Sequence, residues 1–232
     1  MLLTRPQPAI APSVPSAAAD AVPAPAASQA RRATVAVVGI DGSGKTTAAS
    51  YLAASLDDAG TSAQLLRNPS GRSWLGRWSA KSGYAVPATL AETFETVLRG
   101  LNVIRSHTRA RAFAGLTVMD RHLVCQEVTR ETRGLDPNGL LARGLRQLRR
   151  NLREPELTVL LDVSPATALG RIRERGLDTE SLDYLEAARD AYLACAVTEG
   201  WAVIDAEADA FTVVSRLREI VRERIVDPQP AR

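Results

Sequence analysis

The fold of this chain is decided near its start by residues 33–47, which read ATVAVVGIDGSGKTT. Residues 33–40 are β-branched and almost uncharged, which is typical of a strand buried on both faces of a parallel sheet. A Gly-x-x-x-x-Gly-Lys-Thr motif follows, and a helix is predicted over about 45–58. A strand, a glycine-rich turn and a helix in this order predict a phosphate-binding loop.

Glycines in this motif let the backbone curl so that successive N–H groups face an anion. We expect Lys45 to reach the β- and γ-phosphates of ATP, and the hydroxyl of Thr46 to bind Mg²⁺. Lysine occurs only at Lys45 and Lys81 among 29 basic residues, which favours a site at 45 that needs a compact ammonium group. The predicted ATP-binding residues are Gly39, Asp41, Gly42, Ser43, Gly44, Lys45, Thr46 and Thr47.

Further strands are predicted over 63–66, 116–120, 157–163 and 202–205, and they alternate with helices. The helices are predicted over 87–114, 138–152, 164–174, 179–198 and 208–225; the first has Leu90, Phe94, Val97, Leu98 and Leu101 at helical spacing. Such alternation indicates βαβ crossovers. The expected fold is therefore α/β, a three-layer sandwich of the P-loop NTPase type, with a five-stranded parallel sheet between helices.

The chain has 232 residues, which suits one ordinary domain, predicted over 33–226. Residues 1–32 are mostly Ala, Pro and Ser and are predicted to be a disordered tail, as is the short segment 227–232. The aromatic share is 4%, so the core should be aliphatic. Prolines interrupt the start of the chain, and no apolar run approaches the length that spans a bilayer, so neither secretion nor a membrane partner is expected.

The net charge of +3 suits a protein that handles polyphosphates, and it also suits nucleic acid. The arginine-rich stretch 143–153 has a leucine stripe but no interleaved aromatic residues, so we expect a solvated helix face and no nucleic-acid partner. His107 is also expected on a helix surface. Cys125 and Cys195 have no metal-ligand spacing and are predicted to be free thiols, which indicates a cytoplasmic location.

Two acidic residues end predicted strands, where ligands of open α/β sheets bind. Asp120 is followed by Arg121, which favours a functional role. Asp162 is followed by Ser164 and Pro165, which are typical of a turn into a helix. Asp120 is therefore the first candidate.

Several segments, in this order along the chain, resemble the thymidylate kinase family. They are the phosphate loop with its acid at Asp41, Arg67-Asn68-Pro69, Asp120-Arg121-His122, PELTVLLDVSP over 155–165 and the arginine-rich GRIRERG over 170–176. The resemblance covers about 33–225. It implies an ATP- and Mg²⁺-dependent nucleoside monophosphate kinase that phosphorylates dTMP to dTDP, with a short arginine-rich lid. It also implies a homodimer.

The resemblance also implies roles for individual residues. Asp120 would lie near Mg²⁺ and the transferred phosphate. Gly42 stands where some family members have an arginine in the phosphate loop, so charge would come from the lid, where Arg171 and Arg175 share a helix face. The implied catalytic residues are Lys45, Asp120, Arg171 and Arg175, the metal site is Thr46 with Asp120, and the acceptor site is Asp41, Arg67, Arg99, Arg121 and Gln126.

The chain departs from the family after Arg121. Residues 123–130 read LVCQEVTR, without the tyrosine that helps the family exclude a ribose 2′-hydroxyl, and the lid is short. Two other functions remain compatible with the sequence. One is a kinase of a (deoxy)nucleoside or another small hydroxyl compound, in which a strand-end acid acts as the base. The other is a non-catalytic ATP-binding regulatory module.

Overall fold

The computed structural model describes residues 32–69, 87–176 and 180–228. Most of the predicted N-terminal tail (1–31), the end of the predicted C-terminal tail (229–232) and part of the predicted lid (177–179) lie outside the described residues. Secondary structure agrees closely with the predicted alternation. The strands are β1 (Ala33–Val38), β2 (Ala63–Arg67), β3 (Leu116–Asp120), β4 (Leu157–Asp162) and β5 (Ala202–Asp205). The helices are α1 (Lys45–Asp58), α3 (Ala88–Ala112), α4 (Leu123–Thr132), α5 (Leu140–Asn151), α6 (Pro165–Arg175), α7 (Leu182–Glu199), α8 (Ala210–Val221) and a π-helical turn η1 (Arg222–Val226).

The five strands form one parallel sheet in the order β2-β3-β1-β4-β5, which confirms the predicted fold class. Val35, Val37 and Val38 of the central strand β1 have no exposed surface, as expected for a strand covered on both faces. Arg67 of β2 is in register with Asp120 of β3. The carboxyl ends of neighbouring strands therefore place candidate site residues at one edge of the sheet.

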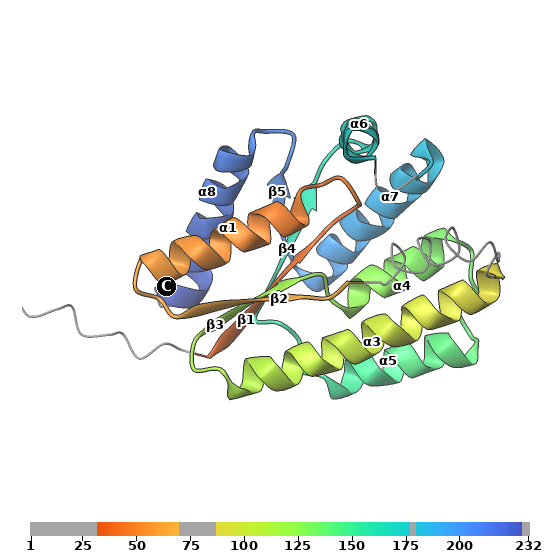
Figure 1. Cartoon of the computed structure of the whole chain (residues 1–232), viewed down its shortest axis with the longest axis horizontal. Coiled ribbons are helices and arrows are strands. Elements are labelled where there is room, and N and C mark those ends of the chain that lie inside the picture. The colour runs from red at the N-terminus through yellow and green to blue at the C-terminus, as the bar shows by residue number, and fades with distance from the viewer. Residues whose placement is uncertain (1–31, 70–86, 177–179, 229–232) are drawn as a thin grey trace, which may run out of the picture.

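Helices cover both faces of the sheet (Figure 1). α1 and α8 pack together on one face, and α3, α4, α5 and α7 lie on the other. α6 stands at the carboxyl edge, next to α7. None of the helices in the described ranges combines the length and the apolar character needed to cross a bilayer.

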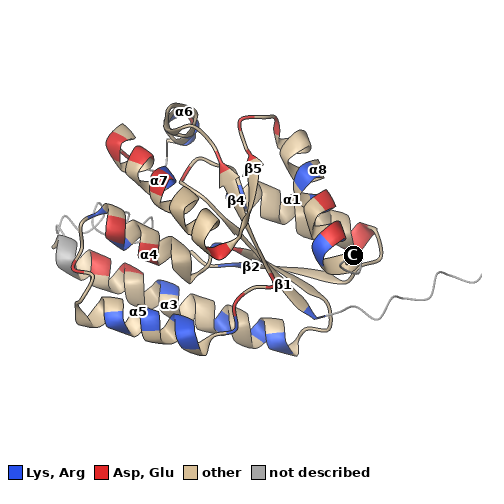
Figure 2. Ribbon diagram, turned by 180° about the vertical axis from the view of Figure 1, so that it is seen from behind, with Lys and Arg blue, Asp and Glu red and all other residues tan. Residues whose placement is uncertain are grey.

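One helix was missing from the sequence-based expectation. α4 follows directly after the Asp120-Arg121-His122 turn, in the segment that departs from the family pattern. Its side chains at Leu123 and Val124 are almost completely buried. Arg149 of α5 holds this layer together through ion pairs with Glu127, Glu154 and Glu199. Figure 2 shows that basic residues recur along α3 and α5.

Candidate active site

The phosphate loop joins the end of β1 to the start of α1. Gly39 has φ +142°, and a side chain there would lie 2.6 Å from the carbonyl oxygen of Leu161. Gly42 has φ +87°, and its added Cβ would lie 2.5 Å from the carbonyl oxygen of Ala168 on α6. Within the described residues, α1 has neither a side-chain N-cap nor an acidic residue in its first turn. The positive end of its dipole is therefore left to attract an anion.

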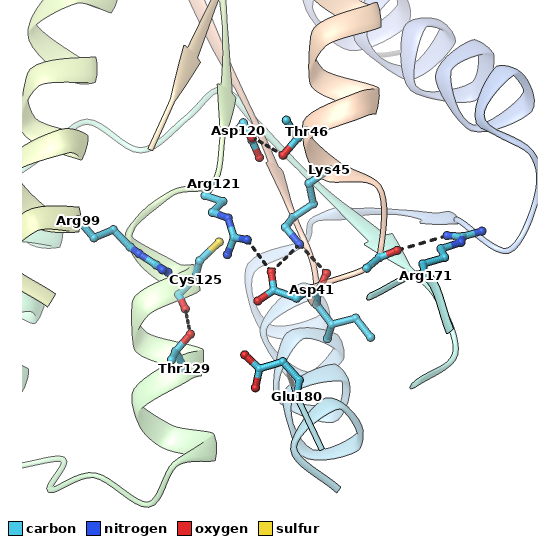
Figure 3. Close-up of polar contacts among 12 residues, drawn as sticks. Asp41, Lys45, Thr46, Arg99, Asp120, Arg121, Cys125, Thr129, Arg171 and Glu180 are labelled. Carbon is cyan, nitrogen blue, oxygen red and sulfur yellow. Dashed lines mark hydrogen bonds and ion pairs between the residues drawn. The ribbon is translucent and has the colours of Figure 1, made fainter. Parts of the chain in front are cut away.

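Lys45 lies on the first turn of α1 and points back into the loop (Figure 3). Its Nζ donates to the carbonyl oxygen of Ile40 at 2.5 Å and lies 3.6 Å from Oδ1 of Asp41. Burial, together with the nearby charge of Arg121, lowers the pKa of Lys45 to about 8, although Asp41 opposes this shift. The Lys45 side chain is only 4% exposed, so an anionic ligand would compensate for the lost hydration of its ammonium group.

Arg121 follows β3 and faces the same carboxylate. Its Nη2 donates to Oδ1 of Asp41 at 2.5 Å. Asp41 therefore lies between two cations, Lys45 at the start of α1 and Arg121 at the end of β3. The arrangement holds Lys45 and Arg121 close enough to act on one pair of phosphate groups.

The predicted metal residues Thr46 and Asp120 are in direct contact. Oγ1 of Thr46 donates to Oδ2 of Asp120 at 2.7 Å. The other carboxylate oxygen, Oδ1, is buried and has no hydrogen-bond partner among the described residues. A hydroxyl and a carboxylate are ligands that Mg²⁺ accepts, so the pair fits this ion. The described ranges contain no group of three or more His, Cys, Asp or Glu side chains that could hold a metal ion.

A buried polar cluster lies between α3 and α4. Arg99 is 2% exposed and pairs with Glu95 through Nη2 at 3.1 Å, whereas its Nε and Nη1 have no partner in the described parts of the chain. Gln126 donates from Nε2 to Oγ1 of Thr96 at 2.9 Å, and its buried Oε1 is likewise without a described partner. Figure 3 shows Arg99 extending toward Arg121. Buried polar atoms without partners are costly unless a ligand satisfies them.

The remaining candidates lie around this centre. Arg67 is exposed and donates from Nη2 to Oγ of Ser50 at 3.2 Å. Arg171 of α6 donates from Nη1 to the carbonyl oxygens of Gly42, at 3.5 Å, and Ala206, at 3.2 Å. Arg175 and Thr47 are exposed. Their roles stay predictions.

Asp162, the competing strand-end acid, has a structural partner. Nε and Nη2 of Arg189 on α7 donate to its two carboxylate oxygens at 2.7 and 2.8 Å. Among the described residues only one oxygen of Asp120 has a hydrogen-bond partner, so the geometry favours Asp120 over Asp162 as a metal ligand. No sequence pattern linked Arg189 to Asp162, because the pair spans 27 residues.

The expectation for His107 was wrong. His107 is 5% exposed, and its Nε2 lies 3.0 Å from Nε2 of the equally buried His122. Burial lowers the pKa of both imidazoles, that of His122 to about 3, with the neighbouring His107 adding to the effect. Both rings are therefore neutral and share one hydrogen bond. The sequence identifies His122 as part of the Asp120-Arg121-His122 segment, but no sequence pattern identifies its partner His107 on α3.

The chain resembles known proteins over most of its length. The family model described as thymidylate kinase matches residues 37–217. A protein of Archaeoglobus fulgidus described as a probable thymidylate kinase is 33% identical over 192 residues, which cover 81% of this chain and 93% of that protein. A thymidylate kinase of Xanthomonas euvesicatoria is 32% identical over 198 residues, covering 83% of this chain and 84% of that protein.

A solved structure of deoxyadenosine kinase from M. mycoides, with the products dCMP and dCDP bound, has the same fold. It superposes with a TM-score of 0.65 at 17% identity and covers 82% of this chain and 99% of that chain. At this identity the likeness concerns the fold alone. The match of the family model and the identity to curated relatives cover most of the chain. This protein therefore belongs to the thymidylate kinase family of phosphotransferases.

Proposed function

We propose that this protein transfers the γ-phosphoryl group of ATP to the 5′-phosphate of dTMP. The observation that carries the choice of acceptor is the cluster of Arg99 and Gln126. Two unpartnered donors of Arg99 and the unpartnered Oε1 acceptor of Gln126 complement a base edge with a carbonyl oxygen next to an N–H group. Thymine has such an edge, as uracil and guanine do, whereas cytosine presents an amino group next to an unprotonated nitrogen. The similarity to thymidylate kinases favours thymine among the three.

The phosphate chemistry would depend on positioning and charge. An oxygen of the dTMP phosphate would attack the γ-phosphorus, the bond to the β,γ-bridging oxygen would break, and ADP would leave. Lys45 would bind the β- and γ-phosphates and Arg121 the acceptor phosphate, and both would exchange Asp41 for phosphate oxygens. Arg171 and Arg175 on the lid helix α6 would add positive charge as the lid closes and excludes water.

Mg²⁺ fits the remaining oxygen of Asp120 and the hydroxyl of Thr46. When bound there, it would neutralise charge on the β- and γ-phosphates. ATP, which supplies the phosphoryl group, would lie along the loop Gly39–Thr47, with its anionic oxygens facing the start of α1. Arg67, level with Asp120, would contact the acceptor.

The test is an ADP-release assay with dTMP, dCMP and thymidine as acceptors. We expect dTMP to give the highest kcat/KM, and Arg99→Ala to reduce it by about tenfold or more, as expected when a buried charge-assisted hydrogen bond is lost. Arg143→Ala, an exposed arginine of α5, is the matched control and should leave it unchanged. Faster turnover of thymidine than of dTMP would assign a hydroxyl kinase. ATP binding without ADP release for any acceptor would assign a regulatory module.

We also propose that the protein is a homodimer and is cytoplasmic. The outer face of α3 carries apolar side chains at heptad-like spacing, Leu90, Val97, Leu101 and Ile104, which are 38–61% exposed. Such a face suits burial against a second copy. Leu101→Glu should convert the dimer to a monomer in light scattering, and a monomeric wild type would contradict the proposal. Both cysteines are free thiols, which suits a reducing compartment.

A further inference from the structure

The turn after β3 holds Arg121 in an unusual backbone conformation. Among the described residues, Arg121 is the only one other than glycine with a positive φ, at 75°. A left-handed backbone is strained for a residue with a side chain, so the surrounding structure has to hold it. Its N–H donates to the carbonyl oxygen of Val37 on β1 at 3.1 Å, which fixes one side of the residue.

The other side of Arg121 is fixed by Asn68, which follows the end of β2. Nδ2 of Asn68 donates to the carbonyl oxygen of Arg121 at 2.7 Å, and the N–H of Asn68 donates to the carbonyl oxygen of Asp120 at 3.2 Å. Asn68 is 1% exposed, so water does not compete with these bonds. One residue therefore binds both peptide groups of the Asp120-Arg121 pair.

The orientation of the Asn68 amide is determined by its partners. Its Nδ2 faces a carbonyl oxygen, which can only accept, and its Oδ1 accepts from Oγ of Ser106 at 2.8 Å. Ser106 lies on α3 and is 5% exposed. An aspartate at 68 would place an oxygen against the Arg121 carbonyl and lose the donor. An alanine would leave the Arg121 carbonyl and the Ser106 hydroxyl without this partner.

We propose that Asn68, oriented by Ser106, is a positioning residue for the reaction. It keeps Arg121 in its left-handed conformation, so that the guanidinium points at Asp41 and at the site of the acceptor phosphate. This inference rests on the proposed function only in taking the acceptor phosphate as the ligand of Arg121.

The kinetic test uses Asn68→Ala, Asn68→Asp and the milder Ser106→Ala, each measured at varied dTMP and varied ATP. We expect the KM for dTMP to rise about tenfold or more in both Asn68 variants. The KM for ATP should stay within about twofold, because the phosphate loop is untouched. Ser106→Thr, which keeps the hydroxyl donor, should have a KM for dTMP close to that of the wild type, unlike Ser106→Ala.

Gln64→Ala is the matched control, because Nε2 of Gln64 donates to Oγ1 of Thr117 at 2.9 Å and so links the same two strands, β2 and β3, away from Arg121. If it raises the KM for dTMP as much as Asn68→Ala does, the inference is wrong. In an Arg121→Ala background, Asn68→Ala should change the KM for dTMP by less than about twofold. Additive effects of the two substitutions would also overturn it.

A crystal structure of Asn68→Ala gives a readout that does not depend on the acceptor. The φ angle of Arg121 should leave the left-handed region or the guanidinium should move away from Asp41. An unchanged Arg121 overturns the inference, whichever acceptor the enzyme uses. Absence of dTMP turnover in the wild type contradicts the proposed function instead, so the two failures are distinguishable.

Discussion

Replacing Lys45 by methionine should make the nucleotide-free protein more stable while it abolishes ATP binding. Burial lowers the pKa of Lys45 from 10.5 to about 8, so the folded state pays for holding a charged ammonium group. A shift of this size corresponds to about 3 kcal/mol, at about 1.4 kcal/mol for each pKa unit. Methionine fills a similar volume without charge, and Asp41 keeps its ion pair with Arg121. We therefore expect the free energy of unfolding at pH 7 to rise by about 3 kcal/mol.

The pH dependence gives the same prediction a second form. Between about pH 8 and 10.5 the unfolded chain binds the Lys45 proton and the folded chain does not, so the wild type gains stability as the pH rises through this window. The difference between variant and wild type should therefore be largest below pH 8 and disappear near pH 10.5. Groups that titrate in both proteins cancel in this difference.

Urea unfolding of both proteins, followed by circular dichroism without nucleotide, measures the effect. Arg143→Met, at an exposed site on α5, controls for the loss of a surface charge. Calorimetry with magnesium and ATP should give heat for the wild type and none for Lys45→Met. A variant that is less stable than the wild type at pH 7 would refute the reasoning that burial of the Lys45 charge destabilises the nucleotide-free protein. A stability difference between variant and wild type that does not change with pH would refute it as well.

Three further substitutions test other parts of the structure. The free energy of unfolding of the wild type should fall by about 2 kcal/mol between pH 7 and 5 through His122 alone. Over this range His122 binds a proton in the unfolded chain but not in the folded one, where its pKa is about 3. In urea unfolding, His122→Gln should remove this part of the loss. Gly42→Ala should lower the free energy of unfolding by at least about 3 kcal/mol, because the new methyl group collides with α6 at a residue with left-handed φ. Gly44→Ala, with φ +86° and no described atom within 4 Å, should lower it by about 1 kcal/mol in the same assay. Equal losses would contradict the collision. Arg149→Ala should cost about 2 kcal/mol at pH 7, since three glutamates lose their cation, and less near pH 4; a loss independent of pH would indicate packing instead.

Local patterns were sufficient for the sheet and the phosphate loop. The strands β1, β3 and β4 are short and largely buried on both faces, so a run of apolar residues identifies each of them, and glycines mark the turn of the phosphate loop. The sequence did not predict α4 because β-branched Val124 and Val128 weaken its helical character. Its N-cap residue, His122, also makes no side-chain capping bond in the described structure. Packing against α7 and α3 supplies what its sequence lacks.

α3 shows why the site could be predicted only in part. Helical spacing of apolar residues ordinarily marks the side that faces the core. In α3 the apolar residues Leu90, Val97 and Leu101 face outward, whereas Arg99 and His107 are buried. A helix that lines a polar site reverses the usual pattern. The buried partners of α3 are Asn68 after β2, His122 before α4 and Gln126 on α4, and folding alone brings them to this helix.

α3 also supports both ends of the proposed acceptor site. Arg99, which would read the base, and Ser106, which supports Arg121 through Asn68, are seven residues apart, about two turns or roughly 10 Å along the axis. A helix does not stretch, so the distance between base contact and phosphate contact is set by the number of residues between them. An acceptor without a 5′-phosphate cannot make both contacts, so the helix would fix the distance between base and 5′-phosphate that the site accepts.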